Sequence, residues 1–176
     1  DTETAQISVQ AALTGHLVLS TLHTNTAAGA ITRLEDMGVE RFLITAAVNG
    51  VLAQRLLRKL CPACKRPARL DVEQMTRLGM TGEVPNDAEV YEAVGCDQCK
   101  GTGYSGRSAI HELFLLDDEI QRAILDGSDA NQLREVARAK GMAKLYEDGM
   151  RKVLAGQTSI DEVLRVTQDQ AELGLD

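Results

Sequence analysis

Four cysteines in two pairs of identical spacing are the residues of this sequence best suited to chemistry. Cys61 and Cys64 form one CxxC pair, Cys96 and Cys99 form the other, and 31 residues separate the pairs. In a CxxC turn two sulfurs converge on one side of a tight loop, and two facing turns supply four thiolates around a tetrahedral Zn²⁺ ion. Four sulfurs leave no open position for water. The spacing therefore predicts a structural zinc site.

Three other uses of these cysteines stay open. Two disulfides would need an oxidising compartment, and the acidic start of the chain is not a secretory signal. A thioredoxin-like motif would need a CxxC between a strand and a helix, which the flanking residues do not predict. Buried thiols used as small apolar side chains would not explain the repeated spacing. The spacer is also longer than the roughly 15 to 20 residues of compact zinc ribbons.

Two histidines flank an apolar run rich in β-forming residues, Leu17–Leu22. This run predicts a strand buried on both faces of a parallel sheet. His23 would stand at the carboxyl end of that strand, where open α/β sheets bind ligands, and imidazole can donate a hydrogen bond to phosphate. The alternative is that His23 caps the next helix and His16 closes a turn. A hydrolase built on Ser20 and His23 would lack an oxyanion turn and an orienting carboxylate.

Two further patterns have simpler interpretations. The segment from Gly101 to Gly106 matches GxGxxG, but it follows a cysteine turn and precedes a predicted strand, so we interpret its glycines as backbone turns beside the metal site. Six basic residues surround the first cysteine pair, and zinc ribbons with such patches often bind nucleic acid. With a net charge of −7, five aromatic residues and no Trp, we expect a solvated face or a subunit contact, and no nucleic acid. The six are Arg55, Arg58, Lys59, Lys65, Arg66 and Arg69.

The elements that must position these residues alternate between helix and strand. Of the 176 residues, 44% are hydrophobic and 26% charged, as in a soluble globular protein, and no apolar run approaches the roughly 20 residues of a membrane span. Helices are expected over 2–13, 26–37 and 42–49, a strand over 51–60 and a weak helix over 72–78. A strand over 107–114 and four short helices over 118–125, 130–140, 142–155 and 160–166 follow, resembling a small bundle. The fold class is therefore α/β.

Five blocks of this sequence resemble the secretion ATPases, the hexameric motors of type II protein secretion and type IV pilus assembly. The blocks are Asp1–Ala5, Thr14–Asn25, Gln54–Leu56, Cys61–Cys64 and Gly95–Arg107. The resemblance runs over nearly the whole chain and keeps the motif order. It implies the C-terminal part of a RecA-like P-loop ATPase domain, with an inserted tetracysteine zinc module and a small C-terminal helical subdomain. The implied boundaries are 1–60 for the ATPase core, 61–106 for the zinc module and 107–176 for the helical subdomain.

The resemblance also implies roles for five residues. His23 would contact the γ-phosphate as a catalytic residue, with His16 as its partner at the other end of the strand. Asp1 would be the last residue of the Walker B element and catalytic, and Glu3 would belong to the same acidic box. Arg55 would lie near the nucleotide or an adjacent subunit.

The family's Walker A motif, GxxxxGK[ST], is not in this sequence, so we expect a fragment of a longer protein that cannot hydrolyse ATP alone. The intact parent is expected to use ATP and Mg²⁺, to form a homo-hexamer, and to lie in the cytoplasm against inner-membrane secretion platform proteins. Within the family, the segment Glu112–Phe114 and the stretch 148–166 favour secretion over pilus extension. A zinc-dependent binding module without enzymatic activity is the alternative from another class.

Overall fold

The computed structural model describes residues 1–69 and 89–167, which divide into two compact units. Of the described residues, unit 1 comprises 1–53 and 111–144, and unit 2 comprises 54–69, 89–110 and 145–167. Each unit has its own hydrophobic core. The predicted boundaries at 60 and 106 concern the intact protein and stay a prediction.

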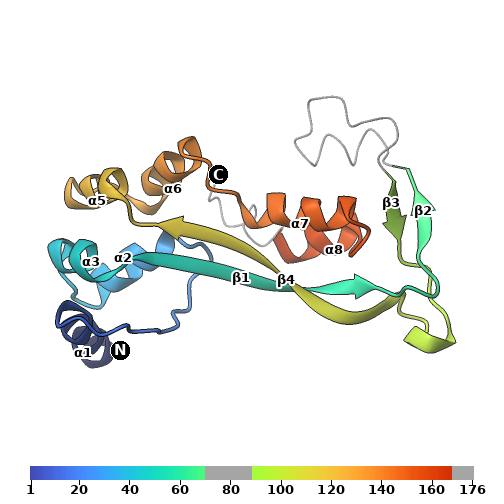
Figure 1. The fold of residues 1–176 in the computed structure, drawn as a ribbon, viewed down its shortest axis with the longest axis horizontal. Helices are drawn as coiled ribbons and strands as arrows, with labels where there is room; N and C mark the ends of the chain where they lie inside the picture. The colour runs from blue at the N-terminus through green and yellow to red at the C-terminus, as the bar shows by residue number, and fades with distance from the viewer. Residues whose placement is uncertain (70–88, 168–176) are drawn as a thin grey trace. The chain divides into compact units, whose positions relative to one another are not determined.

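The long strands β1 (Gly50–Leu60) and β4 (Tyr104–Leu115) pair as a two-stranded sheet and run in opposite directions (Figure 1). Alternation along β4 buries Ile110, Glu112 and Phe114 and leaves the residues between them more exposed. Period-two alternation is what half-buried strands require. Both strands were predicted, and β4 begins three residues earlier than its pattern indicated.

Unit 1 contains five helices among its described residues. Capping explains where several of them begin: the Asp1 carboxylate accepts the Thr4 amide at 2.8 Å, and Asp117 accepts the amides of Glu119 and Ile120. The first helix ends before Gly15, whose φ of +92° is open to glycine at little cost. The helices are α1 (Thr2–Leu13), α2 (Gly29–Asp36), α3 (Arg41–Ala47), α5 (Asp118–Leu125) and α6 (Ala130–Ala139). Their apolar faces meet around buried Ile31, Ile44 and Phe114.

Unit 2 combines a short antiparallel sheet with two helices. The sheet pairs β2 (Arg66–Ala68) with β3 (Val90–Glu92), with Pro67 opposite Tyr91. A 3₁₀ turn, η1 (Asp97–Cys99), lies between β3 and β4. Helices α7 (Leu145–Leu154) and α8 (Ile160–Thr167) pack against each other, and Ser159 caps α8 by accepting the Glu162 amide at 3.3 Å. The core here is built on Leu57, Ile110, Leu145, Val153 and Val163.

The predicted strand over Leu17–Leu22 is wrong for this chain. The segment has no helix or strand, and Leu17 and Leu19 are 84% and 87% exposed. A strand is stable only when neighbouring strands accept its backbone hydrogen bonds, and among the described residues β1 pairs with β4 and β2 with β3. The apolar, β-branched composition alone did not make a strand, because the described strands do not include partners for this segment.

The four C-terminal helices do not form one small bundle, which corrects a second expectation. Helices α5 and α6 pair within unit 1, and α7 and α8 pair within unit 2. Helix α7 begins at Leu145 and not at Met142. The predicted helix over 72–78 lies outside the described residues. Within 1–69 and 89–167, no helix combines the length and apolarity that crossing a membrane requires.

Candidate functional site

The four cysteine sulfurs converge in unit 2, and all of them lie within 4.8 Å of one another. Measured pairs are Cys61 to Cys96 at 3.9 Å, Cys64 to Cys99 at 3.8 Å and Cys96 to Cys99 at 3.7 Å. A tetrahedron with metal–sulfur bonds of about 2.3 Å has its sulfurs about 3.8 Å apart. A disulfide would need about 2.05 Å, and all four thiols are free. The arrangement therefore fits a tetrahedral zinc site.

The first cysteine turn closes directly after β1. The amide of Cys64 donates to the Cys61 carbonyl at 3.3 Å, and the amide of Lys65 donates to the same oxygen at 3.0 Å. The Cys61 amide donates to the carbonyl of Gly103 at 2.9 Å. This last bond joins the first cysteine turn to the backbone that follows the second pair.

The second cysteine turn depends on two glycines, Gly95 before it and Gly103 after it. Gly95 has a φ of +109°, and a Cβ there would stand 2.6 Å from the carbonyl oxygen of Gly101. Gly103 has a φ of +75°, and its Cβ would meet Ala93 at the same distance. Only glycine fits such positions. The interpretation of these glycines as backbone turns, instead of a dinucleotide site, agrees with this geometry.

Backbone amides lower the pKa of one of the four thiols. Burial would raise the pKa of Cys99, but the amides of Cys96 and Gly103, 3.1 and 3.2 Å from its sulfur, lower that pKa to about 6. Burial raises the pKa of Cys64 to about 12, with added effect from the neighbouring thiols. A bound cation lowers the pKa of the thiols that ligate it. The donor set thus combines a thiol of lowered pKa, Cys99, with one of raised pKa, Cys64, and a bound soft divalent cation would favour the thiolate form of both.

Contacts within unit 2 hold the cysteine turns against the connection between α7 and α8. The amide of Leu60 donates to the Gln157 carbonyl at 2.9 Å, and Lys65 Nζ donates to the Gly156 carbonyl at 3.0 Å. The same Lys65 ammonium lies 4.3 Å from the centre of the Tyr91 ring. The metal centre is therefore part of the packing of unit 2.

The predicted nucleotide contacts divide between the two units. Asp1, Glu3, His16 and His23 lie in unit 1, whereas Arg55 lies on β1 in unit 2. Asp1 caps α1, and Glu3 is exposed in its first turn. His16 Nδ1 lies 3.2 Å from the Ala11 carbonyl oxygen, to which it can donate, so this ring closes the end of α1 as the alternative interpretation expected.

His23 is exposed and precedes a buried turn at the start of α2. Thr24 Oγ1 donates to the Thr26 carbonyl at 3.1 Å, and the Gly29 amide donates to Thr26 Oγ1 at 3.0 Å. Helix α2 has no side-chain cap at Ala28, so His23 does not cap it. The ring is thus open to a ligand, and its phosphate role stays a prediction.

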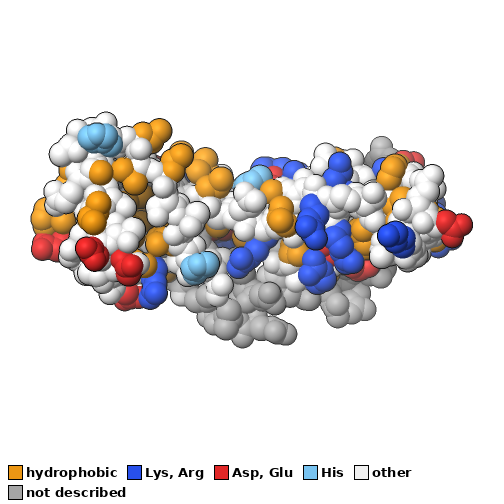
Figure 2. Space-filling view, turned by 90° about the horizontal axis from the view of Figure 1, so that it is seen from below, with side chains coloured by type: hydrophobic (Ala, Val, Ile, Leu, Met, Phe, Trp, Pro, Cys, Tyr) orange, Lys and Arg blue, Asp and Glu red, His pale blue; other side chains and the backbone are white. Residues whose placement is uncertain are grey.

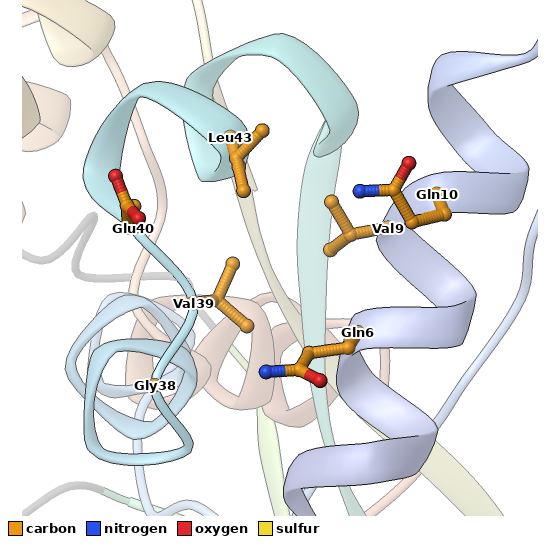
Figure 3. A pocket seen from close by; sticks show the side chains of 7 residues that line it. All are labelled: Gln6, Val9, Gln10, Gly38, Val39, Glu40 and Leu43. Carbon is orange, nitrogen blue, oxygen red and sulfur yellow. The ribbon is translucent and has the colours of Figure 1, made fainter.

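A cavity of about 250 Å³ lies in unit 1 between α1 and the α2–α3 turn (Figure 3). Gln6, Val9 and Gln10 line it from α1, and Val39 and Leu43 line it from the other side. Its lining includes none of the residues predicted to contact nucleotide. It carries no part of the predicted site.

The match to a family model decides the family. Residues 1–165 match the family described as type II/IV secretion system protein. The chain belongs to this family.

Curated members of the family cover nearly the whole chain. A type IV pilus assembly ATPase, PilB of Thermus thermophilus, is 54% identical over 95% of the chain, which spans 19% of that protein. The type II secretion system protein E of Aeromonas hydrophila is 50% identical over 96% of the chain, which spans 33% of it. The chain thus spans between a fifth and a third of these relatives.

Two solved structures show the same fold. The pilus retraction motor PilT, crystallised with bound ADP, is 23% identical and superposes over 99% of the chain with a TM-score of 0.62. The ATPase DotB of Legionella pneumophila is 21% identical, with a TM-score of 0.58. The chain corresponds to 39% and 36% of these structures. It is therefore an α/β segment of the fold seen in both.

In this type II/IV secretion system protein, half of the basic cluster makes internal contacts. Arg58 is bound to Glu162, Arg66 to Glu92, and Lys65 contacts the Gly156 carbonyl and Tyr91. Figure 2 shows Lys and Arg side chains gathered on the visible face beside apolar ones. Whether the cluster is a solvated face or a subunit contact stays a prediction.

The burial of two carboxylates was not predicted from the sequence. Glu112 is 2% exposed and Glu162 is 1% exposed. The signal for Glu112 was available, because it occupies an inward position between Ile110 and Phe114 on an alternating strand. A charged residue at such a position requires a partner in the core.

Proposed function

We propose that this chain is the C-terminal part of an ATPase that powers type II protein secretion. The similarity to type II secretion system protein E along nearly the whole chain supports this proposal. The intact protein would bind ATP with Mg²⁺ and hydrolyse it. The 176 residues alone would not, because they contain no GxxxxGK[ST] loop to hold the phosphates.

A second candidate is type IV pilus assembly by the same kind of motor. The identity to the pilus assembly ATPase PilB favours it and is as high as the identity to the secretion proteins. A zinc-dependent binding module without enzymatic activity is the third candidate. ATP turnover by the intact protein would exclude the third, and the phenotype of a deletion strain would separate the first two.

In the intact protein, residues 1–60 would complete a RecA-like core, 61–106 would form the zinc module and 107–176 would form a strand and helical subdomain.

Cys61, Cys64, Cys96 and Cys99 would hold one Zn²⁺, which the sulfur spacing supports. When bound, the ion would crosslink the two turns as a structural centre. The chain's own backbone bonds from Cys61 and Lys65 would connect that centre to the rest of unit 2, so a rigid module could meet an inner-membrane platform protein.

His23 would contact the γ-phosphate, and its exposure directly before a buried turn supports this role. Asp1 would complete the acidic box of the active site with Glu3. His16 and Arg55 would lie near the nucleotide or an adjacent subunit of a homo-hexamer. Six subunits acting as rigid bodies would work at the cytoplasmic side of the inner membrane.

Kinetics of the intact protein that carries this chain test the proposal. We expect Mg²⁺-dependent ATP turnover that His23→Ala lowers at least tenfold, with unchanged folding by circular dichroism. His111→Ala is a matched histidine control and should retain turnover. Deletion of the gene should abolish secretion of an exported enzyme into the medium; a strain that loses only its pili would favour the second candidate.

A further inference from the structure

The buried carboxylate of Glu112 on β4 fixes the turn that follows His23. Its Oε1 accepts the backbone amide of Ala27 at 3.0 Å, a bond between residues 85 positions apart in the sequence. Both partners are buried, at 2% and 0% exposure, and both belong to unit 1. A buried carboxylate is costly unless it is hydrogen-bonded, so this bond is specific to the observed arrangement.

The position of this bond at the start of α2 determines what it does. The first amides of a helix have no intrahelical acceptor, and Ala28 offers no side-chain cap. Thr26 Oγ1 accepts the Gly29 amide at 3.0 Å, and Glu112 accepts the amide of Ala27, two residues before the first residue of α2. A carboxylate near a helix N-terminus is also favoured by the helix dipole. Glu112 therefore anchors the turn that leads into α2 from another element, β4.

A short set of hydrogen bonds links Ala27, which Glu112 anchors, to the residue next to His23. Thr24, next to His23, donates its hydroxyl to the carbonyl of Thr26 at 3.1 Å. Thr26 is in turn fixed by Gly29 and by the neighbouring bond from Ala27 to Glu112. The backbone on the carboxyl side of His23 is thus held over four residues.

We propose that Glu112 is a positioning residue for His23, which it orients by anchoring the Thr24–Ala27 turn. The inference rests on the proposed phosphate contact of His23. Glu112 touches neither nucleotide nor metal in this role, and it needs only an acceptor oxygen. Replacement by Gln keeps that oxygen, whereas a general base or a metal ligand would lose its function on the same replacement.

Hydrogen–deuterium exchange of the 176-residue chain tests the anchor by itself. We expect Glu112→Ala to accelerate exchange of a peptide covering 24–31 at least tenfold, because the Ala27 amide loses its acceptor. Glu112→Gln should stay within about threefold of the parent. Phe114→Leu, at the next inward position of β4, perturbs the same core without removing the acceptor and should leave this peptide within about threefold. Unchanged exchange in Glu112→Ala would overturn the anchor.

ATP turnover of the intact protein tests the link to His23. Glu112→Ala should lower kcat about tenfold with KM for ATP within about twofold, since a misplaced group is lost mainly from the transition state. Glu112→Gln and Phe114→Leu should keep kcat within about twofold. Glu112→Ala combined with His23→Ala should be no slower than His23→Ala alone.

The outcomes separate the inference from the function on which it rests. Faster exchange with unchanged kcat in Glu112→Ala, while His23→Ala is slow, would overturn the positioning role. An equal loss of kcat in Glu112→Gln and Glu112→Ala would overturn the positioning role and favour a direct chemical role of Glu112. If His23→Ala itself turns over normally, the proposed phosphate contact fails, and the positioning role fails with it.

Discussion

Glu162 anchors unit 2 through five hydrogen bonds, and its replacement gives the sharpest stability test. The side chain of this carboxylate is 0% exposed. It accepts the Arg58 amide at 2.9 Å and the Arg58 guanidinium at 3.0 and 2.6 Å. Arg165 donates two further bonds at 2.8 and 2.7 Å. Glu162→Gln keeps the volume but puts an amide group among these donors.

The expected loss of stability in Glu162→Gln follows from the burial of this carboxylate. Removing one member of a buried ion pair costs roughly 3–5 kcal/mol. The Arg58 and Arg165 side chains are 45% and 57% exposed, so water can rehydrate them and the cost lies at the lower end, about 3 kcal/mol. With an m-value of about 2 kcal/mol per molar urea, the midpoint should fall by about 1.5 M.

Tyrosine fluorescence during urea unfolding is the assay. The chain has no Trp, and its three tyrosines, at 91, 104 and 146, all lie in unit 2. Tyr104 is close to the site, with Arg58 over its ring at 4.1 Å. Glu135→Gln is the control, because Glu135 is 68% exposed, lies in unit 1 and meets Arg138 only at 3.9 Å. We expect no shift of the midpoint in this control.

The stabilisation by Glu162 should depend on pH in a definite direction. Burial alone would raise the pKa of Glu162, but the bonds from Arg165 and Arg58 lower it from 4.5 to about 2. A carboxylate whose folded pKa is depressed stabilises the fold fully above its unfolded pKa, and loses that contribution as the pH falls. The difference between parent and Glu162→Gln should be constant above about pH 5 and shrink from pH 4.5 towards 2. A difference below about 1 kcal/mol at pH 7, or one that grows on acidification, would show that the ionised Glu162 does not anchor unit 2.

Three further predictions concern unit 2. Gly95→Ala should weaken zinc retention at least tenfold in a chelator competition, because its Cβ would stand 2.6 Å from a carbonyl oxygen. Gly106→Ala is the control, since Gly106 also has a positive φ but has open space around it, and it should not weaken retention. Equal zinc affinities of the two variants would contradict this prediction. Gly149→Ala should lower the free energy of unfolding of unit 2 by about 1–3 kcal/mol in urea, because the new Cβ would lie 2.6 Å from Val163. This loss is expected although alanine has a better helix propensity than glycine. A stabilised variant would show that Gly149 and Val163 are not in this close contact. Chelation of the metal should raise hydrogen exchange in the cysteine turns before that of α1, and simultaneous loss of both would count against a local structural centre.

Local features of the fold were predictable because their causes are local. The helices over 118–125 and 160–166 were predicted, and Asp117 and Ser159, the residues directly before them, each accept a backbone amide of the first turn. The two CxxC pairs predicted a common centre from spacing alone, since the turn geometry of each pair leaves few ways to place four sulfurs. The structure brings them together.

The errors arose where stability depends on distant partners. Leu17–Leu22 has strand composition, but only neighbouring strands can make it a strand. The burial of Glu112 and Glu162 was missed because Ala27 and Arg58, which bind them from other elements, are 85 and 104 residues away; the pair of Glu162 with Arg165, three residues on, is typical of an exposed helix face and does not indicate burial. A pattern of neighbouring residues cannot predict hydrogen bonds over such sequence distances. The inward position of Glu112 on an alternating strand nevertheless indicated a buried carboxylate.

The most direct test of the central claim, a tetracysteine zinc centre that holds unit 2 together, is metal analysis with X-ray absorption on the reduced, folded protein. We expect one zinc per chain, with four sulfur neighbours at about 2.3 Å. A folded protein with a metal content near zero, or a zinc shell made of nitrogen and oxygen, would contradict it.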